Sequence, residues 1–227
     1  MTYGVSWLQQ MSGSTAMKPL FASCVATMAV ALIVGVFGGA EPSAFSLSGP
    51  SWPQPQVSYL VNATNLDLPG LSAVNAVRSG ADAWLQQSNA FQFVYGGSSS
   101  QTTNTFDSIN LVLFRNASSG SAIATTYWWA SGNRIVDADV VFWDGAFTFF
   151  AGASGCSGGF YIEDIAAHEF GHALGLGHSA SAAATMYPSV STCNTGNRTL
   201  DGDDIAGVRS LYPLLGPGAP TGLRVVN

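Results

Sequence analysis

The stretch His168-Glu-Phe-Gly-His-Ala-Leu-Gly-Leu-Gly-His178 contains all three histidines of this 227-residue chain. On a helix, residues four apart lie on one face, so His168 and His172 can bind a single metal ion through their imidazoles. Glu169 would lie beside that metal without binding it. Gly175 can adopt the positive φ that ends a helix, which lets the chain turn back and bring in His178 as a third ligand. Three histidines leave one tetrahedral position of a zinc ion open for water.

The spacing H-E-x-x-H-x-x-G-x-x-H is a signature of zinc peptidases. The alternative is a buried helix with incidental histidines, and it does not explain why every position of the pattern is matched. The sequence therefore predicts one catalytic Zn²⁺ per chain, held by three histidines, with Glu169 as the catalytic base.

The N-terminal region contains 18 residues without a charge, from Leu20 to Phe37, between Lys18 and the small residues 38–40. This pattern predicts a signal peptide that is cleaved after Ala40, and hence a secreted, extracellular protein. The alternative is an uncleaved membrane anchor, because 18 apolar residues approach the minimum for spanning a bilayer. Met17 could be the true start of translation.

The charge and the cysteines of the chain after the leader limit its possible functions and its covalent structure. Without the leader, six arginines and thirteen acidic residues remain, so nucleic-acid binding is not expected. Cys156 and Cys193 are then the remaining cysteines, and an even pair in an oxidising compartment predicts a disulfide. Its loop would enclose the zinc helix and stabilise the fold by about 4 kcal/mol. The competing interpretation is a free thiol that reaches the zinc.

Apolar periodicity predicts the order of the secondary-structure elements. Spacings of three and four residues indicate helices at residues 71–87 and 161–174, and a third that begins after Asp201 and ends before Pro213. The Gly-, Ser- and Thr-rich residues 96–105 predict a mobile surface loop. Strands are expected at residues 56–61, 91–95, 110–114, 123–129 and 135–142.

Several segments resemble the matrixins, the matrix-metalloproteinase group of the metzincins. The motif Ala184-Thr-Met-Tyr-Pro188 looks like the matrixin turn that follows the zinc motif, and residues 57–61, 81–84 and 203–208 resemble the family's entry strand, first helix and final helix. The resemblance implies an α+β fold with a twisted, mixed five-stranded sheet, three helices and an active-site cleft. It divides the chain into a leader (1–40), a short linker (41–50), a catalytic domain (51–213) and a linker-like tail (214–227).

The resemblance also implies roles for individual residues. Met186 would support the histidines from below, and Tyr187 and Pro188 would form one wall of the pocket for the residue after the scissile bond. Three aspartates lie near the family's calcium-binding region, so Ca²⁺ is a further candidate, with the ligands Asp137, Asp139 and Asp144. No histidine remains for the structural zinc that matrixins usually bind, and the usual cysteine-containing prodomain is missing.

These features predict a secreted zinc-dependent metalloendopeptidase that hydrolyses peptide bonds in proteins. An extended substrate peptide would pair with an outer edge strand, most simply residues 123–129. Tyr127, Trp128 and Trp129 either line this cleft or belong to the core. We expect protein or peptide substrates, no nucleic acid, no membrane contact after cleavage of the leader, and a monomer. The alternative is a zinc-containing module that binds peptides or a surface without cleaving them.

Overall fold

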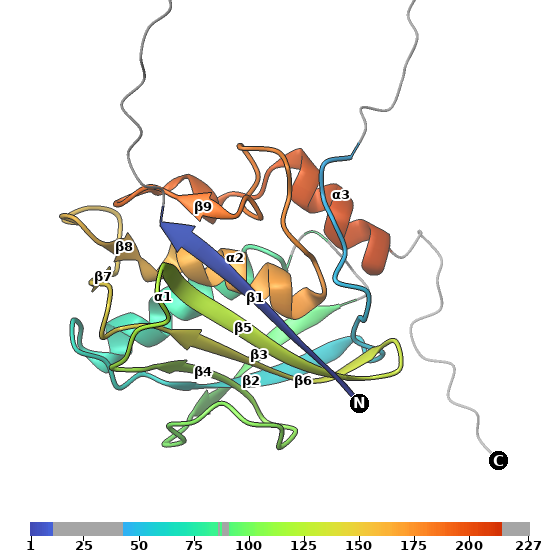
Figure 1. Cartoon of the computed structure of the whole chain (residues 1–227), viewed down its shortest axis with the longest axis horizontal. Coiled ribbons are helices and arrows are strands. Elements are labelled where there is room, and N and C mark those ends of the chain that lie inside the picture. Colours follow the sequence, from blue (N-terminus) through green and yellow to red (C-terminus); the bar gives the residue numbers. More distant parts are fainter. Residues whose placement is uncertain (11–42, 86, 88–90, 215–227) are drawn as a thin grey trace, which may run out of the picture. The chain divides into compact units, whose positions relative to one another are not determined.

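The computed structural model describes residues 1–10, 43–85, 87 and 91–214, apart from the side chains of residues 7, 9 and 10. A mixed sheet forms one layer, and two helices cover one of its faces (Figure 1). The helices are α1 (Gly70–Asp82), α2 (Ile162–Leu174) and α3 (Gly202–Leu211). The longer strands are β1 (Thr2–Gln10), β2 (Gln56–Asn62), β3 (Gln92–Ser98), β4 (Asn110–Phe114), β5 (Ala122–Ser131) and β6 (Arg134–Phe142).

The sheet has the strand order β3-β2-β4-β6-β5-β1-β9, in which β9 is Ser189–Val190. Strands β3, β2, β4 and β6 run parallel to one another, while β5 is antiparallel to β6. The five predicted strands are therefore present, and the predicted α+β class with a mixed sheet is confirmed. The short strands β7 (Phe149–Phe150) and β8 (Phe160–Tyr161) form a separate pair, and a 3-10 turn covers Gly196–Arg198.

Strand β1 was not expected from the sequence, which assigns its residues to a leader. It pairs antiparallel with β5 and parallel with β9, and so covers the outer edge of β5. The prediction that residues 123–129 form an outer edge strand is therefore wrong for the described chain. Since β1 pairs with β5 in an extended conformation, this edge of β5 can pair with an extended peptide.

Two element boundaries also differ from the prediction. Helix α1 ends at Asp82, and Trp84 follows in a turn, where its indole N–H donates to the Ala167 carbonyl at 2.9 Å. Strand β3 continues to Ser98, through residues predicted to be loop. At the end of that loop, the Thr105 N–H donates to the buried Asp139 carboxylate. The residues that follow it, Asp107 and Ser108, donate their N–H groups to the buried Asp137 carboxylate.

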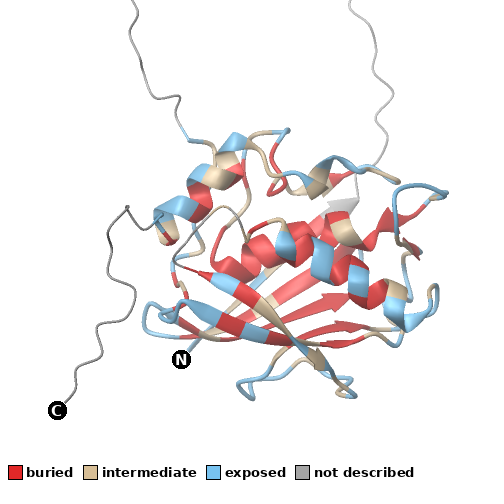
Figure 2. Cartoon of the chain, turned by 180° about the vertical axis from the view of Figure 1, so that it is seen from behind, coloured by how far each residue is buried: buried red, intermediate tan, exposed pale blue. Residues whose placement is uncertain are grey.

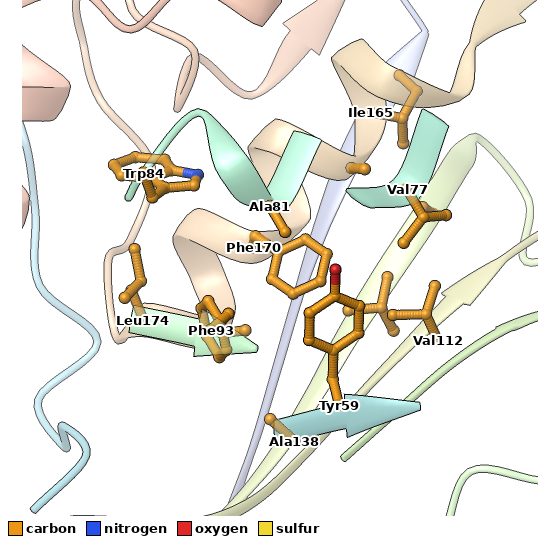
Figure 3. Packing of buried hydrophobic residues seen from close by; sticks show 14 of the residues in the cluster. Tyr59, Val77, Ala81, Trp84, Phe93, Val112, Ala138, Ile165, Phe170 and Leu174 are labelled. Carbon is orange, nitrogen blue, oxygen red and sulfur yellow. The ribbon is translucent and has the colours of Figure 1, made fainter. Parts of the chain in front are cut away.

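The core lies between the helices and the sheet, where the buried faces of both meet (Figure 2). Phe170 of α2 packs on Tyr59 of β2 and Phe93 of β3, with ring centroids 4.9 and 5.0 Å apart (Figure 3). Such edge-on aromatic contacts add about 0.5–1.5 kcal/mol each beyond the burial of their area. This packing fixes α2, and with it the zinc motif, against the sheet.

Cys156 and Cys193 form a disulfide, with 5.5 Å between their Cα atoms. The bond links the loop before α2 to the segment after the zinc motif, as the sequence predicted. Within the described residues, no helix is long and apolar enough to cross a membrane. The predicted signal peptide at residues 20–37, and nearly all of the predicted tail, lie outside the described residues.

Candidate metal centre

Helix α2 places His168 and His172 one turn apart, and Gly175 ends it in the left-handed conformation with φ 103°. A Cβ atom at this position would collide with the Pro50 carbonyl oxygen, so both the backbone conformation and the space require glycine. The N–H of Leu176 then bonds the Gly171 carbonyl at 3.0 Å, which satisfies an unpaired group of the last helical turn. After this turn the chain returns toward the helix and places His178 next to the other two histidines.

The three imidazoles converge on one point. Their candidate ligand atoms lie within 4.8 Å of one another, and the ring centroids are 4.6–5.4 Å apart. His168 Nδ1 lies 2.6 Å from the Thr185 carbonyl, and His172 Nδ1 lies 2.9 Å from the Leu176 carbonyl. Since a carbonyl only accepts, each Nδ1 carries the proton, and the Nε2 lone pair remains available for a metal.

The Nε2 atoms of His168 and His172 are fully buried and have no hydrogen-bond partner within the described part of the chain. A buried polar atom without a partner is costly, and a metal ion would remove that cost. Burial also lowers the pKa of His168 to about 3 and lowers the pKa of His172 well below its usual value. Both rings are thus neutral, as zinc ligands must be, and three imidazoles are a donor set that fits zinc.

Glu169 is fully buried beside the histidines on α2. Its Oε2 accepts a hydrogen bond from the Thr126 hydroxyl of β5 at 2.6 Å, and its Oε1 has no partner among the described residues. Burial raises the pKa of Glu169 to about 8, although hydrogen bonds from Thr126 and from the backbone of Leu8 act in the opposite direction. A cation at the histidines would favour the carboxylate further. Glu169 thus lies next to two of the histidines in the chain, and its role as a proton acceptor stays a prediction.

Thr126 is a site residue that the sequence did not reveal. It is a buried polar residue of β5, like its neighbour Thr125, and it also donates to the Glu169 carbonyl at 3.0 Å. A polar side chain on the inner face of a strand is the signal that could have identified it.

Met186 is 1% exposed and packs under the zinc helix, where its sulfur is so close to Gly171 that no Cβ would fit there. The Met186 turn is held by Asp204 of α3, which accepts the N–H of Thr185 at 2.7 Å and that of Met186 at 3.0 Å. The same carboxylate completes a capping box with Asp201 at the start of α3. Tyr187 and Pro188 follow in half-buried positions, and their role as a pocket wall stays a prediction.

The three candidate calcium ligands have backbone partners. Asp137 accepts the N–H groups of Asp107 and Ser108, both at 2.8 Å. Asp139 accepts two further N–H groups, and burial raises its pKa to about 7. Asp144 accepts the N–H of Leu66 at 2.8 Å. Among the described residues, only the three histidines form a group of three or more potential ligands, so calcium binding stays a prediction.

Comparison of the sequence with known proteins identifies the family of the chain. A family model described as Matrixin matches residues 51–213. Similar proteins include the human neutrophil collagenase, 49% identical over 59 residues, and the hatching enzyme of Paracentrotus lividus, 52% identical over 58 residues. A third is metalloendoproteinase 1 of Glycine max, 51% identical over 53 residues.

These alignments are short. Each of the first two covers 26% of this chain, and the third covers 23%. They span only 13%, 10% and 17% of the respective relatives. The match of the family model is much longer, and it includes the three histidines, Glu169 and the Met186 turn. The chain belongs to the matrixin family.

Proposed function

We propose that this protein is a secreted, zinc-dependent endopeptidase that hydrolyses peptide bonds in proteins. The observation that carries the proposal is the convergence of three neutral imidazoles next to a buried carboxylate on the same helix. The match to the matrixin model and the metalloproteinase names of the relatives support the same reaction. The leader-like apolar stretch and the disulfide support secretion.

Zinc in a three-histidine site supplies a Lewis acid and lowers the pKa of water to about 7. Glu169 accepts the proton of the attacking water and passes it to the amine that leaves, a contribution typically worth about 10² to 10⁴ in rate. Thr126 fixes Oε2 of Glu169, and Oε1 has no hydrogen-bond partner among the described residues. His168 and His172 keep their orientation because backbone carbonyls hold their Nδ1 atoms.

Strand β1 covers the edge of β5, and cleavage of the leader after Ala40 would remove it. An extended segment of the substrate protein would then pair with this edge. Trp128 of β5 is 9% exposed and belongs to the core, whereas Tyr127 and Trp129 are half-buried on the other face. Tyr187 and Pro188 would limit the pocket for the residue after the scissile bond. The protein acts as a monomer in this proposal.

Proteolysis of casein by the zinc-loaded chain tests the proposal. We expect cleavage that a chelator abolishes, and a loss of at least about 10²-fold in Glu169→Ala while zinc remains bound. Glu163→Ala is the matched control, because Glu163 lies in the first turn of the same helix and pairs with Arg198 at 3.2 Å. Full activity in Glu169→Ala would contradict the assigned base. Binding of casein without any cleavage would favour the non-catalytic module instead.

A further inference from the structure

The pairing of β1 with β5 shows which residue of an extended strand lies opposite each residue of this edge (Figure 1). The two strands are antiparallel, so that Ser6 lies opposite Thr126 and Gly4 lies opposite Trp128. In the proposed function the leader is cleaved, and a segment of the substrate takes the place of β1. The fit between β1 and β5 therefore indicates which residues a substrate can carry at each position of the edge.

Gly4 is the position of β1 at which this fit is tightest. Successive residues of a strand face opposite sides, so Gly4 shares its side with the buried Leu8. Tyr3 and Val5 face the other side and are 52% and 46% exposed. A Cβ atom on Gly4 would collide with the six-membered ring of the Trp128 indole. A glycine, which has no Cβ, is therefore the residue that fits opposite this ring.

Packing holds the Trp128 ring in its position. The side chain is 9% exposed and belongs to the main apolar cluster of the core, so a ring that moved aside would leave a gap in that cluster. Trp128 also faces the same side of β5 as Thr126, whose hydroxyl contacts Glu169 at 2.6 Å. The ring thus lies on the side of the strand that faces the candidate site.

The indole N–H of Trp128 is a second sign of contact with a ligand. Its Nε1 is buried and has no hydrogen-bond partner within the described part of the chain. A buried donor without an acceptor is costly, and a polar atom of a bound substrate would remove that cost.

We propose that Trp128 is a specificity-determining residue that selects substrates with a glycine opposite its indole ring. This inference rests on the proposed function. The selection acts by exclusion, because a residue with a Cβ must push the ring out of the core or lift its own strand off β5. A substrate that pairs as β1 does places this glycine two residues before the residue opposite Thr126. Since Thr126 contacts the proposed base Glu169, the glycine lies on the amino side of the cleaved bond.

Cleavage of a randomised peptide library by the secreted, zinc-loaded chain tests this selection. Mass spectrometry of the products identifies the residues on the amino side of each cut. We expect glycine to be preferred over alanine by at least about tenfold at one of these positions, because the methyl group of alanine would collide with the ring. In Trp128→Leu the flat ring is removed, so we expect glycine and alanine to be accepted about equally there.

Trp129→Leu is the matched control, because Trp129 is the next residue of β5 and is half-buried on the opposite face. We expect this variant to keep the preference for glycine. Zinc content and circular dichroism verify that both variants are folded. The profile of the original chain tests the inference even if Trp128→Leu does not fold.

The outcomes separate this inference from the proposed function. Equal acceptance of glycine and alanine at every amino-side position by the original chain would overturn the inference and leave the peptidase standing. A preference for glycine that persists in folded Trp128→Leu would also overturn it, because another residue would then make the selection. If the zinc-loaded chain cuts no peptide of the library, the proposed function itself fails.

Discussion

At the scale of single residues, Thr126 contacts the proposed base Glu169. Its hydroxyl donates to the carboxylate at 2.6 Å, and this hydrogen bond lowers the pKa that burial raises. A base must be deprotonated to act, so in Thr126→Val the pKa of Glu169 rises and the acid limb of the rate profile moves to higher pH. A hydrogen bond to a charged group is worth about 1.5–3 kcal/mol, which corresponds to a shift of at least about one pH unit.

The pH dependence of kcat measures this shift. Thr125→Val is the matched control, because the Thr125 hydroxyl is also buried but accepts from the Trp143 indole at 2.8 Å instead of contacting Glu169. We expect the control to lose stability and keep the original acid limb. An unchanged acid limb in Thr126→Val, with zinc bound, would refute the link between Thr126 and Glu169.

Gly175 ends α2 and lets the chain turn back, so the position of the third histidine, His178, depends on it. Alanine there would adopt a left-handed conformation, which costs about 1–2 kcal/mol, and its Cβ would also collide with Pro50. We expect Gly175→Ala to lower the free energy of unfolding by more than about 2 kcal/mol and to reduce zinc affinity, measured by urea denaturation and zinc titration. Gly152→Ala separates the strain of the left-handed backbone from the collision. Gly152 also has a positive φ, +91°, but has open space around it. Equal losses in both variants would show that the collision is unimportant.

The sequence located the residues of the candidate metal centre better than the residues that surround them. The three histidines and Glu169 follow a spacing that one helix and one turn impose, so local sequence is sufficient to bring them together. Thr126 lies 43 positions from Glu169, and no local pattern connects them. Its role depends on the way β5 packs against α2.

At the scale of elements, helix α3 supports the zinc site through one carboxylate. Asp204 is 1% exposed and accepts three backbone N–H groups, from Thr185, Met186 and Asp201. Asp204→Ala leaves these donors without an acceptor, at about 1–3 kcal/mol each, so we expect a loss of at least about 3 kcal/mol in unfolding free energy. Urea denaturation measures the loss, and Arg209→Ala on the exposed side of α3 is the control. A loss below about 1 kcal/mol would contradict this account of the turn.

The elements were predictable where apolar periodicity is strong. The prediction for residues 110–114 matches β4, and α2 begins one residue after its predicted start. Helix α1 ends at Asp82, and the chain continues in turns that bond the Trp84 N–H to the Ala81 carbonyl. The bond from the Trp84 indole to the Ala167 carbonyl is a tertiary contact, which local sequence does not show. Strand β1 was missed because its pairing partners, β5 and β9, lie more than 100 residues away in the chain.

At the scale of the whole molecule, burial of the histidines couples folding to pH. Burial holds the pKa of His172 well below its ordinary value of 6.5, so below pH 6.5 the unfolded chain binds a proton that the folded chain does not. This group therefore makes the zinc-free protein less stable as the pH falls below 6.5. We expect His172→Gln to gain stability relative to the original zinc-free chain by up to about 1.4 kcal/mol per pH unit over that range. Urea titrations in chelator at several pH values measure the difference, and a difference that does not change with pH would contradict it.

X-ray absorption at the zinc edge of the purified, zinc-loaded chain tests the central claim most directly. The account predicts one zinc per chain with three imidazole nitrogens at about 2.0–2.1 Å, and a loss of stoichiometric zinc in His172→Ala. A sulfur neighbour at about 2.3 Å, or the lack of stoichiometric zinc in the original chain, would contradict it.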